Sequence, residues 1–323
     1  MKAIARSDYG SPDVLKLEEV DKPVVSNHGV LINVHATSVN AGDLHLMYGT
    51  PLITRLIYGG LRQPKVKILG FDVAGRVEAV GQDVTQFQPG DEVFGDLSEC
   101  GFGAFAEYVC APESALVLKP KTSSFEEAAA VPGAGMTALQ GLRDCGHIQP
   151  GQKVLINGAS GGVGSFAVQI AKVFGAEVTA VCRTQKIDKV RSLGADHIID
   201  YTQTDITQTQ QVYDLILDAA AYRSVFDYLP MLRSQGTYVM VGGSIPRFFQ
   251  IMLFGSWMSK WSGRTVKHLG VKPNQADLLL LQEMLTSGQI KPLIDHQYSL
   301  TDLPLAMRRL EQRQVVGKLS IRV

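Results

Sequence analysis

The segment Lys153–Gly164 constrains the fold of this chain more than any other. Its apolar run 154–156 is typical of a buried parallel strand, and a turn of small residues follows at once: Gly158, Ala159, Gly161, Gly162 and Gly164. Apolar residues then recur at helical spacing over 166–173. A strand, a Gly-rich turn and a helix N-terminus together make a pyrophosphate site, because backbone N–H groups point at the anion and missing side chains let it approach. The pattern Ala-x-Gly-x-x-Gly therefore predicts a dinucleotide-binding unit, and a Gly-rich turn without a ligand is the alternative.

Strand-like and helix-like segments alternate after this turn. The predicted strands are 177–182, 197–200, 215–218, 236–241 and 265–269. Helices are expected to begin near Gln185, near Tyr222 and in the segment before Thr265. This alternation predicts a parallel doubly wound sheet. The strand at 265–269 should lie on the edge of that sheet and pair with a second copy, so a homodimer is expected.

The first part of the chain is rich in short strands instead. The predicted strands are 30–36, 72–81, 92–94 and 103–109, with a turn at 88–91. Short strands separated by frequent turns are typical of a small β-rich domain of the barrel or sandwich type.

Helical signals begin at Ser124, which precedes Glu126 and Glu127 as a helix cap. Further helices are predicted at 137–145, 275–287 and 303–313, and a closing strand at 317–323. We therefore predict a dinucleotide-binding domain at 125–271, inserted into a β-rich domain made of 1–124 plus 272–323.

Charge and cysteine content argue against several classes of protein. Lys+Arg and Asp+Glu both number 31, so no basic excess attracts nucleic acid. The four cysteines are scattered without paired spacing, which is typical of free thiols in a reducing compartment. The first residues lack the apolar region of a signal peptide, so a cytoplasmic location is expected.

The longest apolar stretch, Phe248–Met258, is too short to cross a bilayer, which needs about 20 residues. No stable membrane insertion is therefore expected. A role as a lid or as interface packing is favoured over docking on a membrane surface.

Motifs along the whole chain resemble the medium-chain dehydrogenase/reductase superfamily, in its zinc-independent quinone oxidoreductase branch. They are Thr37–Asp43, Gly70–Val77, Pro89–Gly95, Gly103–Tyr108, the Gly-rich turn, Met136–Ala138, Ser192–Asp196 and Gly317–Lys318. The apolar insert between Met47 and Leu69 resembles a subgroup close to chloroplast-envelope quinone oxidoreductase homologues. The resemblance implies an α/β fold: a Rossmann doubly wound parallel sheet inserted into a GroES-like β-rich domain.

The chain departs from the zinc alcohol dehydrogenases of that superfamily at their metal ligands. Asn40 stands where those enzymes have a cysteine, and Gly70-Phe71-Asp72 replaces their Gly-His-Glu. A phenyl ring offers no lone pair and an amide is a poor ligand for zinc, so no metal site is expected. Without a Lewis acid, alcohol oxidation has nothing to stabilise an alkoxide, although a zinc-free alcohol dehydrogenase-like enzyme stays an alternative.

The residues after the strand 177–182 favour a phosphorylated dinucleotide. Arg183 and Lys186 follow this strand, and no carboxylate comes before Asp188 to bind the ribose diol of NAD. By resemblance, Lys186 and Tyr201 flank the 2′-phosphate of NADPH. The alternative is that both cations are ordinary solvated residues at a helix start.

The resemblance also implies which residues contact the cofactor. Gly133 and Thr137 would line the nicotinamide slot, and the turn before Ser244 would contact the carboxamide unless it is a simple strand-end turn. The full set of expected cofactor-binding residues is Asn40, Thr137, Ala159, Ser160, Gly161, Gly162, Val163, Gly164, Cys182, Arg183, Lys186, Tyr201, Val241, Gly242, Gly243 and Lys318. A surface role is the alternative for Lys318.

Candidates for catalysis are Asn40 and Tyr48. An amide or phenol hydrogen bond can stabilise a developing enolate or quinol oxyanion without a metal. A loop-turn role for Asn40 and a packing role for Tyr48 are the alternatives. Asp43 is expected to order the loop rather than to transfer protons.

These features predict an NADPH-dependent oxidoreductase that transfers hydride to a quinone or to the β-carbon of an α,β-unsaturated carbonyl. The expected partner is a small, hydrophobic, electron-poor acceptor, for which the apolar residues at 52–53, 56–57 and 248–258 are suited. The alternatives are a non-catalytic NADPH-binding redox sensor, an RNA-binding relative, which the neutral net charge disfavours, and a polyketide-type enoyl reductase module, which the lack of linker sequence disfavours.

Overall fold

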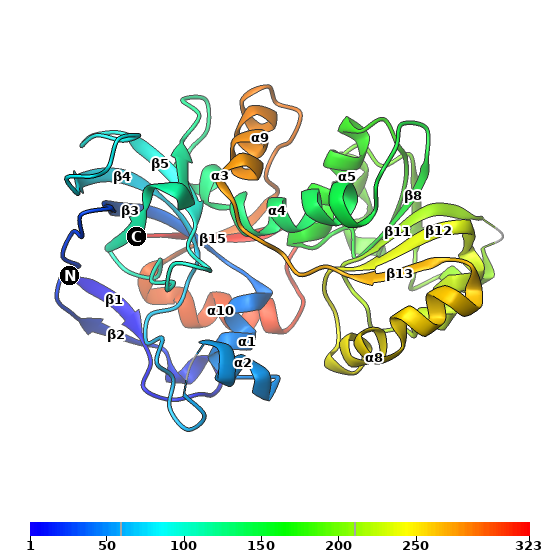
Figure 1. The fold of residues 1–323 in the computed structure, drawn as a ribbon, viewed down its shortest axis with the longest axis horizontal. Helices are drawn as coiled ribbons and strands as arrows, with labels where there is room; N and C mark the ends of the chain where they lie inside the picture. Colours follow the sequence, from blue (N-terminus) through cyan, green and yellow to red (C-terminus); the bar gives the residue numbers. More distant parts are fainter. Residues whose placement is uncertain (59, 210) are drawn as a thin grey trace. The chain divides into compact units, whose positions relative to one another are not determined.

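The computed structural model describes residues 1–58, 60–209 and 211–323 (Figure 1). Contacts between Cα atoms divide the chain into two compact units. Unit 1 is made of Met1–Gly133 and Pro273–Val323, and unit 2 of Ala134–Lys272.

Unit 2 is built on a six-stranded sheet in the order β10-β9-β8-β11-β12-β13, and every neighbouring pair is parallel. The strands are β8 (Lys153–Asn157), β9 (Glu177–Cys182), β10 (His197–Asp200), β11 (Tyr213–Asp218), β12 (Leu232–Met240) and β13 (Thr265–His268). The doubly wound parallel sheet predicted from the alternating segments is confirmed, and β13 lies on its edge.

Helices connect the strands of this sheet. They are α4 (Pro132–Gln140), which begins in unit 1, a π-helical turn η3 (Gly141–Cys145), α5 (Gly162–Val173), α6 (Ile187–Arg191), α7 (Val225–Tyr228) and α8 (Ile245–Ser262). Short 3-10 turns are η4 (Thr184–Lys186), η5 (Ile206–Gln208) and η6 (Leu229–Met231). Apolar strand residues such as Leu155 and Ile216 are fully buried, as expected of a sheet covered on both faces.

Unit 1 contains a seven-stranded sheet in the order β14-β15-β3-β4-β5-β7, with β6 also paired to β3, and a separate two-stranded sheet β1-β2. The strands are β1 (Lys2–Ala5), β2 (Lys16–Glu19), β3 (Gly29–Val39), β4 (Asp72–Val80), β5 (Glu92–Asp96), β6 (Tyr108–Pro112), β7 (Leu116–Leu118), β14 (Ile294–Ser299) and β15 (Lys318–Arg322). The closing strand β15 pairs antiparallel with β3, so the C-terminal segment returns to the first domain as predicted.

Helices of unit 1 pack around this sheet. They are α1 (Ala41–Tyr48), α2 (Leu52–Tyr58), α3 (Phe125–Ala129), α9 (Gln275–Thr286) and α10 (Leu303–Glu311), with 3-10 turns η1 (Pro12–Val14), η2 (Glu113–Ala115) and η7 (Leu300–Asp302). Ser124 caps α3 as predicted: its hydroxyl accepts from the Glu127 amide, and the Glu127 carboxylate accepts from the Ser124 amide.

One predicted strand is wrong in its position. The sequence favoured a strand at 103–109, whereas β6 begins only at Tyr108. Phe102 and Gly103 have φ values of 67° and 106°, which belong to the left-handed region and interrupt an extended strand. Phe105 and its neighbours Ala104 and Ala106 are all fully buried, so this segment fills the core instead of alternating between two faces.

The division between the units also falls elsewhere than the sequence suggested. We predicted the dinucleotide-binding domain at 125–271, whereas the compact unit spans Ala134–Lys272. The helix α3 accounts for the difference, because it packs against β3, β4, β5 and β15 of unit 1.

Candidate functional site

In unit 2, the Gly-rich turn joins β8 to α5. Gly161 is the N-cap residue of α5 and offers no side-chain oxygen to the amides of the first helical turn. Those amides precede the first intrahelical hydrogen bond, from the Ser165 amide to the Gly161 carbonyl at 2.9 Å. A helix N-terminus without a side-chain cap is suited to an anion, so this turn fits a dinucleotide pyrophosphate.

Close packing explains two of the glycines in the turn. Gly158 has a φ of 77°, and a Cβ atom on Gly164 would lie 2.1 Å from the Gly158 carbonyl oxygen. Gly161 differs, because a Cβ atom there would meet only that same oxygen at 3.4 Å, an ordinary contact. Gly164 is therefore required by the fold, whereas Gly161 leaves the space beside the helix start open.

Other predicted residues of the turn contribute backbone rather than side chain. Ala159 is fully buried, and its amide donates to the Val181 carbonyl at 3.1 Å. Ser160 is buried as well, and Gly162 and Val163 form the first turn of α5.

The residues proposed for a 2′-phosphate lie at the ends of β9 and β10. Arg183 Nε donates to the Tyr201 hydroxyl at 3.1 Å, so the two predicted residues are brought together. Lys186 lies in η4, directly after β9. Cys182 is buried, its carbonyl accepts from the Tyr201 amide at 3.1 Å, and burial raises the pKa of its thiol to about 11.

The sequence missed a carboxylate in this region. Asp200, at the end of β10, accepts hydrogen bonds from the Thr184 hydroxyl and from the amide and hydroxyl of Thr202. These bonds lower the pKa of Asp200 and occupy both of its oxygens. Asp200 is remote from Arg183 in sequence, and only the pairing of β10 with β9 makes them neighbours. The edge of this sheet therefore carries one carboxylate beside its cations.

The turn after β12 serves the fold through its backbone. The Val241 amide donates to the Asp218 carbonyl at 2.9 Å, and the Gly242 carbonyl accepts from the Ala221 amide at 3.0 Å. Gly243 has a φ of 148°, and a Cβ atom on it would lie 2.6 Å from Ala221. Thr137 of α4, the other predicted nicotinamide residue of unit 2, is half-buried.

In unit 1, the carboxylate of Asp72 organises a buried polar cluster. Its Oδ2 accepts from the Ser38 hydroxyl, from Asn40 Nδ2 at 2.8 Å and from Lys318 Nζ at 3.1 Å, and its Oδ1 accepts from the Gly133 amide at 2.8 Å. Lys318 Nζ also donates to Asn40 Oδ1. Four segments distant in sequence, the ends of β3, β4 and β15 and the start of α4, are thus joined at one carboxylate.

Lys318 is not a surface residue, so that alternative is wrong. Its side chain is only 3% exposed, and that of Asp72 is fully buried. A buried ammonium needs a counter-charge, and Asp72 supplies it. Asp72 stands where the zinc enzymes have a glutamate, and its place directly before the apolar pair Val73 and Ala74 was the sequence signal of a buried carboxylate.

Hydrogen bonds fix both the backbone and the side chain of Asn40. It is the N-cap residue of α1, in a capping box with Asp43, whose Oδ2 accepts from the Asn40 amide at 2.9 Å. Asp43 Oδ1 accepts from the Gly70 amide at 3.2 Å, and Asp43 therefore orders the loop as expected. Its complete burial raises the pKa of Asp43 to about 7.

Asp96 is a second buried carboxyl near this cluster. Burial and then the charge of Asp72 raise the pKa of Asp96 to about 7, while its bond from the Ser98 amide at 2.8 Å opposes the shift. Three aspartates, Asp43, Asp72 and Asp96, therefore share the interior of unit 1 with the cation of Lys318.

Tyr48 is not brought together with this cluster. Its hydroxyl donates to Glu311 of α10 at 2.5 Å. This bond, followed by burial, raises the pKa of Tyr48 to about 12. The phenol therefore holds its proton tightly and already has an acceptor.

No three His, Cys, Asp or Glu side chains are grouped to hold a metal ion in residues 1–58, 60–209 and 211–323. At the position of the zinc ligands, Phe71 packs against the glycines of α1 and α4. A Cβ atom on Gly42 would lie 3.2 Å from its ring, and one on Gly133 only 2.5 Å.

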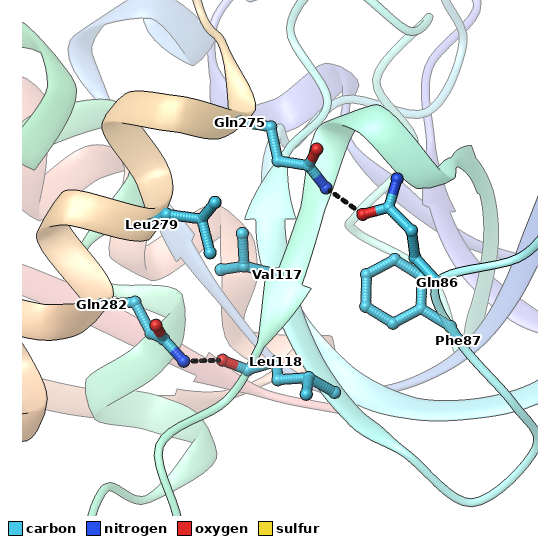
Figure 2. A pocket seen from close by; sticks show the side chains of 7 residues that line it. All are labelled: Gln86, Phe87, Val117, Leu118, Gln275, Leu279 and Gln282. Atoms are coloured by element: carbon cyan, nitrogen blue, oxygen red, sulfur yellow. Dashed lines mark hydrogen bonds between the residues drawn. The ribbon is translucent and has the colours of Figure 1, made fainter.

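A small hollow of unit 1 lies between α9 and β7 (Figure 2). Gln275 Nε2 donates to Gln86 Oε1 at 2.8 Å and Gln282 Nε2 donates to the Leu118 carbonyl at 3.1 Å across it. None of the predicted cofactor or catalytic residues lines this hollow. It is a gap in the packing of α9 against β7 and is not part of the candidate site.

Comparison with known proteins agrees with this architecture. Residues 26–121 match the family model of the alcohol dehydrogenase GroES-like domain, and residues 193–320 match that of the zinc-binding dehydrogenases. The chain is 34% identical over 333 residues to a 2-methylene-furan-3-one reductase of Solanum lycopersicum, covering 99% of this chain and 79% of that protein. It is 33% identical to a chloroplastic NADPH-dependent alkenal/one oxidoreductase of Arabidopsis thaliana, with the same coverage.

The structure is similar to that of a quinone oxidoreductase from Coxiella burnetii, with a TM-score of 0.89 and 29% identity over 100% of this chain and 99% of that one. These relatives match 99% or more of this chain, so the similarity includes both units. The chain therefore belongs to the medium-chain dehydrogenase/reductase superfamily, in its quinone oxidoreductase branch.

Proposed function

We propose that this protein is an NADPH-dependent reductase that transfers hydride to a quinone or to the β-carbon of an α,β-unsaturated carbonyl. The observation that carries the proposal is the uncapped start of α5 behind the Gly-rich turn, with Arg183 and Lys186 at the end of the neighbouring strand. The names of the relatives, an alkenal/one oxidoreductase and quinone oxidoreductases, point to the same two acceptor classes.

The bound coenzyme would supply the hydride, and this chain would hold and orient it. First-turn amides of α5 would bind the pyrophosphate, while Arg183, Lys186 and Tyr201 would bind the 2′-phosphate. The remaining proposed coenzyme contacts come from Thr137, the turn 241–243, Asn40 and Lys318.

Asn40 is the proposed hydrogen-bond donor to the acceptor oxygen or to the nicotinamide. Its amide nitrogen donates to Asp72 at 2.8 Å and makes only a long contact of 3.5 Å with the Ser38 carbonyl, and Lys318 fixes its oxygen. The side chain therefore cannot rotate without breaking the bonds to Asp72 and Lys318. A donor fixed in advance costs no reorganisation when charge develops on the acceptor. We assign the final proton to solvent rather than to Tyr48, because the Tyr48 hydroxyl is engaged with Glu311.

A hydrophobic acceptor suits the apolar side chains of α2. Leu52, Ile53, Leu56 and Ile57 are all exposed, so they are available to a ligand instead of filling the core of unit 1.

Coenzyme preference and turnover test the proposal together. Steady-state rates with NADPH are measured on a panel of quinones and enones, alongside the variant Lys186→Ala. The variant should raise KM for NADPH about tenfold or more and leave KM for NADH unchanged, because a hydrogen bond to a charged group contributes about 1.5–3 kcal/mol.

The outcomes separate the alternatives. Equal effects of Lys186→Ala on both coenzymes would remove the 2′-phosphate assignment. Tight NADPH binding without turnover on either acceptor class would favour a redox sensor over an enzyme.

A homodimer that pairs the β13 edges of two copies remains part of the proposal, as does a cytoplasmic location. An edge strand presents unpaired backbone groups that a second copy can satisfy. Sedimentation velocity that gives only the monomer mass would contradict the dimer.

A further inference from the structure

The helix α8 exposes a row of large apolar side chains at a spacing of four residues. Phe249, Leu253, Trp257 and Trp261 follow one line of the helix, and together with Met252 and Phe254 they are between 46% and 72% exposed. The rings of Trp257 and Trp261 stack with centroids 6.0 Å apart. We call these six residues the α8 face.

The opposite side of α8 is packed against the sheet (Figure 1). Ile251 and Met258 are buried in the core of unit 2 with Val266 of β13, and the Val266 amide donates to the Ser259 hydroxyl at 2.9 Å. The helix therefore has a fixed orientation, and the α8 face points away from the core of its own unit.

The sequence segment that contains α8 carries charge of a single sign. The sequence contains no Asp or Glu from Tyr228 to Ala276, although acidic and basic residues are equal in number over the whole chain. The same stretch carries Arg233, Arg247, Lys260, Arg264, Lys267 and Lys272. Arg233 is paired with Asp214 at 2.9 Å, and Lys267 donates to the Cys145 carbonyl, so these two do not contribute to the argument. Among the described residues, no acidic side chain lies within ion-pair distance of Lys260, Arg247 or Arg264, and the last two donate to Gln250 and to backbone carbonyls.

We propose that the α8 face docks the protein on the surface of an anionic lipid bilayer. Exposed Trp, Phe and Leu side chains, on a helix that carries Arg and Lys and no acidic residue, are of the residue types that enter a membrane interface. The basic residues add attraction to anionic headgroups. Among the residues that the structure describes, none of the helices qualifies as a membrane-spanning segment.

A second copy of the chain fits this surface less well. A two-fold interface places the same patch on itself, so the basic residues Arg247, Lys260 and Arg264 would face a patch that offers no acidic residue from its own helix. The proposal is independent of the proposed reaction.

Vesicle binding tests the proposal on the full chain. The protein is mixed with phosphatidylcholine vesicles with and without phosphatidylglycerol, and binding is followed by pelleting and by tryptophan emission. Both tryptophans of the chain lie on the α8 face, so emission reports this surface alone. We expect pelleting and a blue shift with anionic vesicles only, and both should decline at high salt.

Three variants sharpen the test. Leu253→Glu should abolish binding, and Lys260→Gln should weaken it about fivefold, since one basic residue near an anionic surface contributes about 1 kcal/mol. Leu279→Glu, at a 45% exposed leucine of α9, is the matched control and should bind as the wild type does. Circular dichroism checks that each variant is folded, and Trp257→Ser serves if Leu253→Glu is not.

Two results would overturn the proposal. One is a folded wild-type protein that stays in the supernatant with anionic vesicles at low salt. The other is a change of Leu253→Glu from dimer to monomer in sedimentation velocity, because the α8 face would then be covered by a second copy.

Discussion

At the scale of single residues, the buried pair of Asp72 and Lys318 is the most consequential feature of unit 1. Each group would be costly to bury alone, and together they fix Asn40, the proposed donor. The pair therefore links the stability of unit 1 to the geometry of its proposed site.

Removing the charge of Asp72 should destabilise the protein strongly. Asp72→Asn keeps an acceptor for the Gly133 amide but leaves the Lys318 ammonium without a counter-charge, so we expect a loss of about 3–5 kcal/mol in the free energy of unfolding. Urea denaturation measures it. Asp13→Asn, which breaks the exposed pair with Arg308, is the control and should leave the denaturation midpoint unchanged. A loss for Asp72→Asn as small as that of the control would contradict the role of the pair.

Asp96 should make stability depend on pH. Its native pKa of about 7 lies above the unfolded value of about 3.9, so the native state holds a proton that the unfolded state has released between these values. The free energy of unfolding therefore falls as pH rises through this window, by up to about 1.4 kcal/mol per pH unit for one proton.

Asp96→Asn should remove this contribution and flatten the pH dependence measured by urea denaturation between about pH 5 and pH 7.5. Part of the slope should persist, because burial also raises the pKa of Asp43 to about 7 and that of Asp218 to about 6. Asp8→Asn, at an exposed position, is the control. A slope unchanged by Asp96→Asn would show that Asp96 ionises normally inside the fold.

At the scale of elements, the turn between β8 and α5 contains two kinds of glycine. Gly164 is needed for close packing, whereas Gly161 is not, and the space beside it is available to a ligand. Gly164→Ala brings a Cβ atom onto the Gly158 carbonyl, so we expect a lower melting temperature. Gly161→Ala meets no such clash, and its melting temperature should stay close to that of the wild type.

Coenzyme binding should distinguish the same two variants. The added methyl of Gly161→Ala stands at the helix start, where it would obstruct a pyrophosphate, so the affinity for NADPH should fall about tenfold in a fluorescence titration. Unchanged affinity in a folded Gly161→Ala variant would place the pyrophosphate elsewhere.

Some elements were predictable and others were not, for identifiable reasons. The cap at Ser124 and the parallel strands follow from local chemistry and apolar runs, and both are confirmed. The segment 103–109 was predicted as a strand because many of its residues are apolar. In the structure, Phe102 and Gly103 have left-handed backbone conformations and consecutive side chains are buried, so the segment is not a regular strand. Whether neighbouring residues share one burial environment depends on the surrounding fold.

At the scale of the whole molecule, unit 2 is continuous in sequence whereas unit 1 is assembled from two segments. The main buried cluster around Leu155 and Tyr238 consists entirely of residues from unit 2. We therefore expect a fragment spanning 132–272 to fold by itself and to retain NADPH binding.

Far-UV circular dichroism, thermal melting and NADPH titration of the fragment measure this. A cooperative melt with NADPH binding that is retained, but weaker than that of the full chain because Asn40 and Lys318 are missing, is the expected result. A fragment that folds but does not bind NADPH would place essential contacts in unit 1, and an unfolded fragment would contradict the independence of unit 2.

Local patterns of apolar residues and glycines were enough to specify the parallel sheet and the Gly-rich turn. The burial of Lys318, its pairing with Asp72, the contact of Asp200 with Thr184 and that of Tyr48 with Glu311 depend instead on the three-dimensional fold. These contacts join residues far apart in the chain. A side chain's charge state and availability depend on such neighbours, and sequence spacing does not specify which residues the fold brings together.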